Sequence, residues 1–302
     1  MVEGILNVNK PRGMASFAVV SLVRRLTGVR RVGHAGTLDP IADGVLPICI
    51  GRHATRIVEY LVDAPKVYRA RILLGVATDT YDSEGEVVAT GDPSGVTRAQ
   101  LETALRPFVG EIQQVPPMYS ALKYEGQPLY RYARAGKTVP REARTVAIYR
   151  LELLDFESPL VEIEMECGRG AYVRTVAQDL GERLGCGGHL VGLTRLRSGP
   201  FLLEEAIGVE ELEEVARHDA WQEVLSGVDR VLESWDAALL GQEHTIDVRQ
   251  GRPLVLIPAR PEAAEVAPDA LCRAYSEAGT FLGILRYGGE GRWRPEKVFA
   301  AL

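Results

Sequence analysis

The sequence has few of the features that mark extracellular or membrane proteins. It contains four cysteines in 302 residues, and no two of them form a C-x-x-C pair. Disulfide frameworks and zinc sites need paired or clustered cysteines, so we expect Cys49, Cys167, Cys186 and Cys272 to be small buried hydrophobic residues. No apolar run reaches the roughly 18 residues of a membrane span, and the first residues lack a secretory core. We therefore expect a cytoplasmic protein without a membrane partner.

Charge is also unevenly distributed. The formal net charge is -6, which by itself argues against a polyanionic partner. Residues 204–236, however, hold eleven acidic side chains and only two arginines, so the rest of the chain sums to about +3. Basic side chains gather within residues 10–31 and again within 123–144. These patches are compatible with RNA binding, and composition alone fits solvated helix faces equally well.

The periodicity of apolar residues predicts a mixture of strands and helices. Predicted strands cover residues 4–9, 66–76 and 160–168. One predicted helix has Ser16 as its N-cap and ends at Gly28, and a second begins near Gly51. Two more predicted helices cover residues 97–112 and 171–185. The polar, turn-rich segment 78–96 is predicted to be a surface excursion, and 113–145 an ordered loop with a short helix over a binding surface. Residues 204–240 are predicted to be helical, and the remainder to form a small β-rich domain.

The segment "GHAGTLDPIADGVL", residues 33–46, places one carboxylate in a glycine-rich loop. Pro40 disfavours the helical conformation for Asp39, so Asp39 is expected to be extended. Gly36 and Gly44 allow sharp turns or close approach of a ligand. The loop can therefore present Asp39 to a cleft. A turn in which Asp39 bonds only its own backbone is the alternative that this segment leaves open.

Five separated segments resemble, in order and spacing, the bacterial tRNA pseudouridine-55 synthases, the TruB family. They are "LNVNKPRGMASFAVV", "GHAGTLDPIADGVLPICIGRHATR", "KVYRARILLG", "PPMYSALKYEGQPLYRYARAG" and "GRGAYVRTVAQDLGERLGCGGHLVGLTRLRSG". The resemblance implies an α+β fold with a mixed, mainly antiparallel sheet flanked by helices and loops. It implies a catalytic domain over 1–238 with an RNA-binding insertion at about 116–145, and a PUA-like β-barrel over 239–302.

The family's activity is implied in the same way. It isomerises uridine 55 in the T loop of tRNA by base flipping, with no cofactor, no metal and no guide RNA. The C-terminal domain is expected to touch the acceptor arm, and a monomer is favoured. Whether the aspartate traps the sugar or assists a glycal stays open.

The resemblance also assigns site residues one by one. Asp39 matches the catalytic aspartate, Tyr68 the tyrosine of the K-x-Y strand and Arg174 the arginine of Y-x-R-T. Substrate contacts are expected from His34, Lys10, Tyr172, Leu193, Leu196, Lys123, Arg131, Arg134 and Arg141. Arg174 has an independent argument, because a cation in the first turn of a helix is disfavoured by the helix dipole and favoured again by a facing carboxylate. Pairing with Asp39 is expected to lower the pKa of that acid.

Three positions depart from the family pattern: Asn9, Ala35 and Asp43. Asp43 also permits a rival, a glycoside hydrolase or nucleosidase that uses Asp39 and Asp43 as a carboxylate pair. A second rival is an RNA-binding protein without catalysis. Tritium release from uridine C5 separates these activities.

Overall fold

The computed structural model describes residues 2–256 and 266–299. The chain forms two units, the first ending at Ser226 and the second beginning at Gly227. The division therefore lies before the boundary expected after residue 238, and residues 227–238 belong with the C-terminal unit. The two units are described separately.

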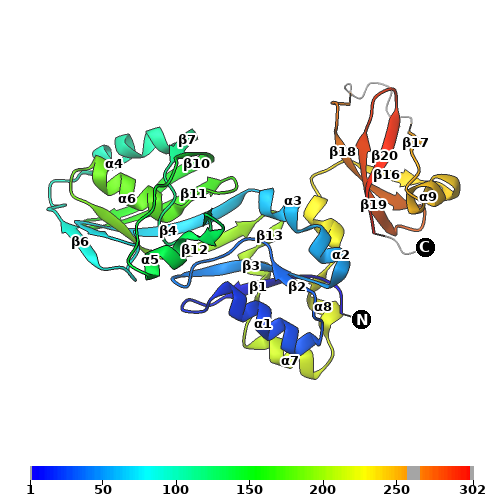
Figure 1. Ribbon diagram of the computed structural model, residues 1–302, viewed down its shortest axis with the longest axis horizontal. Helices are drawn as coiled ribbons and strands as arrows, with labels where there is room; N and C mark the ends of the chain where they lie inside the picture. Colours follow the sequence, from blue (N-terminus) through cyan, green and yellow to red (C-terminus); the bar gives the residue numbers. More distant parts are fainter. Residues whose placement is uncertain (1, 257–265, 300–302) are drawn as a thin grey trace. The chain divides into compact units, whose positions relative to one another are not determined.

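The first unit is built on an eleven-stranded mixed sheet (Figure 1). Its main path is β14 (Ile207–Gly208), β1 (Gly4–Lys10), β3 (Ala42–Ile50), β12 (Gly188–Ser198), β4 (Lys66–Leu74), β11 (Leu160–Cys167), β10 (Arg144–Glu157) and β7 (Gly110–Gln114). Three short strands lie off this path, namely β2 (Val32–His34), β13 (Phe201–Leu202) and β15 (Leu225–Ser226). Only β1 with β14 and β12 with β3 pair in parallel. The mixed, mainly antiparallel sheet is confirmed.

Strand β12 occupies the place in the sheet that matters for the site. It pairs with β3 on one side and with β4 on the other, so Arg195 lies opposite both Gly44 and Tyr68. A Cβ on Gly44, whose φ is +97°, would collide with the backbone of Arg195. Glycine at this position therefore allows the two strands to approach.

Helices cover the sheet in two groups. At the β1–β3 end, α1 (Ser16–Thr27) lies beside α7 (Glu211–Arg217), and α4 (Arg98–Leu105) and α6 (Val173–Arg183) pack at the β10–β4 end (Figure 1). The remaining helical turns are α2 (Gly51–Arg56), α3 (Val58–Asp63), α5 (Leu129–Arg134), α8 (Trp221–Val224), η1 (Arg106–Phe108) and η2 (Leu203–Glu205). Buried aliphatic side chains from both helix groups form the core with the sheet. All four cysteines are free and buried, as expected.

Three local expectations need correction. Ala15, not Ser16, is the N-cap of α1, because the Ser16 hydroxyl bonds elsewhere. The helix expected over 97–112 begins with a capping box between Thr97 and Gln100 but already ends at Leu105. The strand β7 occupies the end of the expected range. The segment 78–96 is only partly a surface excursion: β5 (Val76–Thr78) and β6 (Val87–Thr90) pair, and the turn between them is buried at Thr80 and Asp82.

The acidic segment 204–240 is also less helical than expected, because short helices alternate with extended pieces. In the insertion, β8 (Lys123–Tyr124) and β9 (Gln127–Pro128) form a hairpin before α5. A loop with a short helix is therefore confirmed.

The second unit is a small β unit, as expected. Its five-stranded sheet has the order β16 (Ala237–Leu240), β18 (Leu271–Ser276), β19 (Phe281–Tyr287), β20 (Arg292–Val298) and β17 (Leu254–Val255). The sheet curls as a half-barrel, accompanied by α9 (Gln242–Arg249) and η3 (Val228–Leu232). Its own core includes Leu240, Val248 and Leu285.

Candidate active site

The loop that carries Asp39 is fixed from both sides. The Ser16 hydroxyl donates to the carbonyl of Leu38 and accepts from its amide, both at 2.8 Å. On the other side, the amide of Gly13 donates to the carbonyl of Pro40 at 2.7 Å. The residues before and after Asp39 are therefore both anchored to the β1–α1 connection. This anchoring explains why the chain folds a proline-containing turn at one defined position.

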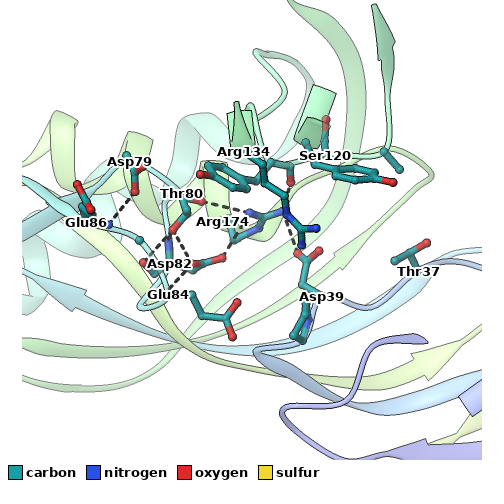
Figure 2. Close-up of a pocket in the computed structure, with 15 residues that line it drawn as sticks. Thr37, Asp39, Asp79, Thr80, Asp82, Glu84, Glu86, Ser120, Arg134 and Arg174 are labelled. Carbon is teal, nitrogen blue, oxygen red and sulfur yellow. Dashed lines mark hydrogen bonds and ion pairs between the residues drawn. The ribbon is translucent and has the colours of Figure 1, made fainter. Parts of the chain in front are cut away.

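Arg174 holds the carboxylate of Asp39 from α6. Nη2 of Arg174 lies 3.0 Å from Oδ2 of Asp39, and Nη1 lies 3.4 Å from Oδ2 of Asp82. The same guanidinium donates to the carbonyls of Tyr119 (2.9 Å) and Thr80 (3.2 Å). Figure 2 shows Arg174 between the two carboxylates. The predicted ion pair is confirmed, and it offsets the unfavourable place of Arg174 in the first turn of its helix.

The exposure of the two partners differs. The side chain of Arg174 is 5 % exposed, whereas that of Asp39 is 37 % exposed. The guanidinium is therefore a fixed internal group, and the carboxylate keeps one side open to the cleft. An acid oriented in this way can act on a bound molecule.

The pKa of Asp39 does not shift in the expected direction. Burial raises the pKa of the carboxyl above its usual value of 3.8, and the charge of Arg174 lowers it without cancelling the rise. Asp82 adds to the rise through like-charge repulsion. The expectation of a lowered pKa was wrong because it considered the ion pair and omitted desolvation.

Asp82 is a site residue that the sequence reasoning missed. It is buried, its carboxylate accepts a hydrogen bond from the Thr80 hydroxyl at 2.6 Å, and it forms the second ion pair of Arg174. The turn-rich composition around it suggested a surface loop. The one available signal was the dense acidic pattern "DTYDSE", which is costly to bury without a cation.

Two cavities share the ion pair. The larger has a volume of about 520 Å³ and is rich in carboxylates; its charged lining residues are Asp39, Asp79, Asp82, Glu84, Glu86, Arg134 and Arg174. The smaller has a volume of about 260 Å³, and its charged lining residues are Asp39, Lys66, Arg169, Arg174 and Arg195. We call the larger one the acidic cavity and the smaller one the basic cavity. Only the basic cavity is also lined by Tyr68, Tyr172 and Leu193.

The basic cavity contains the aromatic and apolar residues expected to surround a base. Burial raises the pKa of the hydroxyls of both Tyr68 and Tyr172. Gln114 clamps Tyr172, because its side chain accepts from the Tyr172 amide at 2.7 Å and donates to the Tyr172 carbonyl at 3.0 Å. Leu193 lines this cavity, whereas Leu196 lines neither cavity. Neighbouring residues of a strand face opposite sides, which accounts for the difference from Arg195.

Two predicted contacts lie away from the cavities. The ammonium of Lys10 is buried and donates to the carbonyls of Pro11 (2.9 Å) and Met14 (2.7 Å), and burial lowers its pKa to about 8. Lys10 therefore supports the turn beneath the Asp39 loop instead of facing solvent. His34 is half-buried; burial, followed by the charge of Arg195, lowers its pKa.

The four cations of the insertion are not alike. Lys123 and Arg131 are exposed, and Arg134 is exposed while its guanidinium lies 5.5 Å from the centre of the Tyr130 ring. Arg141 is half-buried and donates to the carbonyl of Pro116 at 3.0 Å. Lys123, Arg131 and Arg134 are therefore available to an external anion. Arg141 instead stabilises the insertion through its hydrogen bond to Pro116.

The carboxylate pair proposed by the first rival is not assembled here. Asp43 lies in β3 opposite Thr194 and lines neither cavity, and the acid that couples to Asp39 is Asp82. Among residues 2–256 and 266–299, no group of three or more His, Cys, Asp or Glu side chains is arranged to hold a metal ion. Nor does any helix in those ranges have the length and apolarity to cross a membrane.

Comparison with protein families gives two adjoining matches. Residues 24–173 match the N-terminal domain of the TruB family pseudouridylate synthases, and residues 174–240 match the C-terminal domain of tRNA pseudouridylate synthase B. The tRNA pseudouridine synthase B of Pseudomonas aeruginosa (strain UCBPP-PA14) is 43% identical over 300 residues, which cover 98% of this chain and 96% of the relative. That of Clostridium perfringens (strain SM101 / Type A) is 40% identical over 284 residues, with 94% of each covered.

Solved structures share the fold. A crystal structure of a Cbf5-Nop10-Gar1 complex contains a chain that matches with a TM-score of 0.76 and 25% identity, covering 99% of this chain and 85% of that one. An H/ACA RNP bound to a substrate RNA containing 2'-deoxyuridine matches with a TM-score of 0.74 and 22% identity, covering 99% and 85%.

Proposed function

The chain belongs to the TruB family and is a tRNA pseudouridine synthase, an isomerase, and from this premise we propose that it converts uridine 55 in the T loop of tRNA to pseudouridine without a cofactor. The reaction breaks the bond from C1' to N1, turns the base, joins C1' to C5, and exchanges the C5 proton for one on N1. No atom is gained or lost. The enzyme therefore has to bind an everted nucleotide and to stabilise charge on its two halves.

Asp39 is the group that acts on the sugar. Departure of the base leaves C1' electron-poor, and a carboxylate can either bond to that carbon or assist loss of a proton to give a glycal. The open side of Asp39, with Arg174 fixed at 3.0 Å behind it, suits this task. No water needs activation, so a single acid is sufficient.

Arg174 and Asp82 set the position and charge of Asp39. A buried arginine cannot lose its proton, and four oxygen partners fix its guanidinium. Asp82 neutralises part of that charge, so the cation does not fully suppress the reactivity of Asp39. We assign Asp82 as a positioning residue that acts through Arg174.

The basic cavity receives the everted uracil. Its volume of about 260 Å³ suits one pyrimidine nucleoside, with Tyr68 and Tyr172 as stacking surfaces and Leu193 as an apolar wall. Enclosure of the base excludes water from a reactive sugar. We assign to the Tyr68 hydroxyl the removal of the C5 proton after the new bond forms, and to His34 stacking on the bases that eversion exposes.

The exposed cations position the RNA. Lys123, Arg131 and Arg134 are assigned to phosphates of the T arm, and the C-terminal unit to the acceptor arm. The insertion is of the long form, for which no guide RNA is required.

The observation that carries the proposal is the carboxylate of Asp39, held at 3.0 Å by a buried guanidinium in the lining of the cavity that also contains Tyr68. The test is a T-arm RNA tritiated at C5 of the target uridine. We expect about one tritium released per RNA and pseudouridine in the digested product. Free uracil would instead identify a nucleosidase, and binding without release an RNA-binding protein.

A further inference from the structure

Two buried cations line the basic cavity. Arg195 is 1 % exposed and Lys66 is 6 % exposed, and both line the cavity next to Tyr68. Both lie in segments that carry the family resemblance, Lys66 as the lysine of the K-x-Y strand, but the resemblance assigned a role to neither. Their burial is costly, because a charged group loses its hydration inside a protein.

The hydrogen bonds of Arg195 connect the parts of the site. Nε donates to the carbonyl of Val45 at 2.6 Å in β3, and Nη2 donates to the carbonyl of Gly36 at 3.1 Å in the loop before Asp39. The guanidinium also lies beside Tyr68, whose pKa it lowers against the larger effect of burial. Arg195 therefore touches both the loop of the acid and the strand of the stacking tyrosine.

Lys66 reinforces the positive charge without offering a free donor. Its ammonium donates to the carbonyls of Leu61, Val62 and Ala64 at the C-terminal end of α3. These contacts satisfy its three N–H groups. Arg195, in contrast, has five N–H groups; two donate to the carbonyls of Val45 and Gly36, and the guanidinium also hydrogen-bonds to the Tyr68 side chain in the cavity.

Neither cation forms an ion pair with any described residue, although the charge of Asp63 acts on Lys66 from a longer distance. Within the residues that the structure describes, no carboxylate oxygen lies within 4.0 Å of the charged nitrogens of Arg195 or Lys66, although Arg197, two residues further, forms an ion pair with Glu166. The basic cavity thus has four cationic lining residues and one carboxylate. An uncompensated buried charge of this kind favours a negative charge in the cavity.

The reaction supplies such a charge at one stage. When the bond between C1' and N1 breaks, its electron pair stays with the base, which becomes a uracil anion with charge over N1, O2 and O4. Resting on the proposed function, we propose that Arg195, aided by the charge of Lys66, stabilises this departing base anion and thereby lowers the barrier to bond cleavage. The charge is fixed before the reaction begins, so little reorganisation is needed.

The test compares two target nucleosides in otherwise identical T-arm RNAs, uridine and 5-fluorouridine. Fluorine withdraws electrons and stabilises the base anion by itself. Cleavage of the bond between C1' and N1 in 5-fluorouridine therefore depends less on the charge of Arg195. Single-turnover consumption of the target nucleoside is followed by digestion and chromatography. For Arg195→Gln we expect a loss of about 100-fold with uridine and about 10-fold with 5-fluorouridine, with RNA affinity changed by less than about 2-fold.

Three further variants separate charge from structure. Arg195→Lys keeps the charge, so its ratio between the two substrates should stay near that of the wild type even if both rates fall. Lys66→Gln keeps a donor for the helix carbonyls and removes the charge; it should change the ratio in the same direction by about 3-fold. The control is Asn7→Leu, because Asn7 is buried, donates to the carbonyl of Leu202 and lines neither cavity. Its ratio should equal that of the wild type.

Equal losses with both substrates in Arg195→Gln and Lys66→Gln would overturn the inference and leave a structural role for both residues. If Arg195→Gln fails to fold, by circular dichroism, the Lys66→Gln ratio decides. Failure of the wild type to convert uridine would overturn the proposed function and this inference with it. Conversion by the wild type with unchanged ratios in the variants would overturn this inference alone.

Discussion

The acidic and the basic cavity share Asp39 and Arg174, yet their linings carry opposite charge. Five carboxylates and two arginines line the acidic cavity, whereas one carboxylate and four cations line the basic one. Asp39 and Arg174 lie where the negatively charged lining of one cavity meets the positively charged lining of the other. An electron-poor sugar next to Asp39 and an electron-rich base above Arg195 would each meet charge of the favourable sign, so the contrast explains how one site can stabilise both halves of a broken glycosidic bond.

The largest effect is expected at Asp39, the carboxylate that lines both cavities. Asp39→Asn keeps the shape and removes the carboxylate charge, so tritium release should fall by at least about 10⁴-fold. Binding of T-arm RNA, measured by filter retention, should stay within about 2-fold. Substantial release from this variant would remove Asp39 from the mechanism.

Arg174→Gln tests the cation between the cavities. It leaves Asp39 and Asp82 without their common cationic partner, so the single-turnover rate should fall by about 10²–10³-fold with little change in RNA affinity. Stability should fall as well, by about 3–5 kcal/mol, because a buried ion pair loses one member. Arg174→Lys is the matched control and should retain more activity, since the charge persists. Near-normal turnover in Arg174→Gln would contradict the positioning role.

Asp82→Asn tests whether Asp82 influences the pKa of Asp39, and the measurement is the turnover rate as a function of pH. Turnover requires ionised Asp39, so the rate should be lost as pH falls through the raised pKa of that acid. Asp82 contributes to the rise; its neutralisation therefore lowers the pKa of Asp39 and moves the acid limb of the rate profile to lower pH. The maximal rate should fall by about 10-fold because Arg174 loses an oriented partner. A limb that stays in place would show that Asp82 does not act on Asp39.

The exposed cations of the insertion should have a smaller and different effect. Replacing Lys123, Arg131 and Arg134 together by glutamine should weaken RNA binding and reduce the slope of log affinity against log salt by about 0.7–0.9 for each lost phosphate contact. The rate at saturating RNA should remain within about 3-fold, because Lys123 and Arg131 line neither cavity and Arg134 lines only the acidic cavity, which Tyr68 does not line. An unchanged salt slope would exclude phosphate contacts.

The smallest effect is expected at a charged pair far from either cavity. Arg217 and Glu214 form an exposed ion pair on α7, so Arg217→Gln should leave turnover, salt dependence and Tm within experimental error. This variant is the control for the insertion variants, since it removes one positive charge from the surface. A reduced salt slope here would mean that the RNA footprint extends to α7.

Much of the fold could be predicted from local pattern. The alternation of β11 and the apolar stripe of α6 each depend on residues close in the chain, and both elements formed where expected. The strand β7 was missed because "GEIQQ" is short and polar. The N-cap of α1 was misplaced because the Ser16 hydroxyl bonds to Leu38, a contact across 22 residues.

The sequence alone determined the family, the isomerase activity, and the positions of Asp39, Tyr68 and Arg174 along the chain, because these depend on short motifs and their spacing. Only the tertiary structure decided that Asp82 joins Arg174, that Lys10 faces inward, and that Arg195 and Lys66 line the same cavity without forming an ion pair in the described part of the chain. These facts depend on strand pairing and burial between segments far apart in sequence. The free energy of a buried charge is set by whatever surrounds it in space, and the order of residues does not reveal those surroundings.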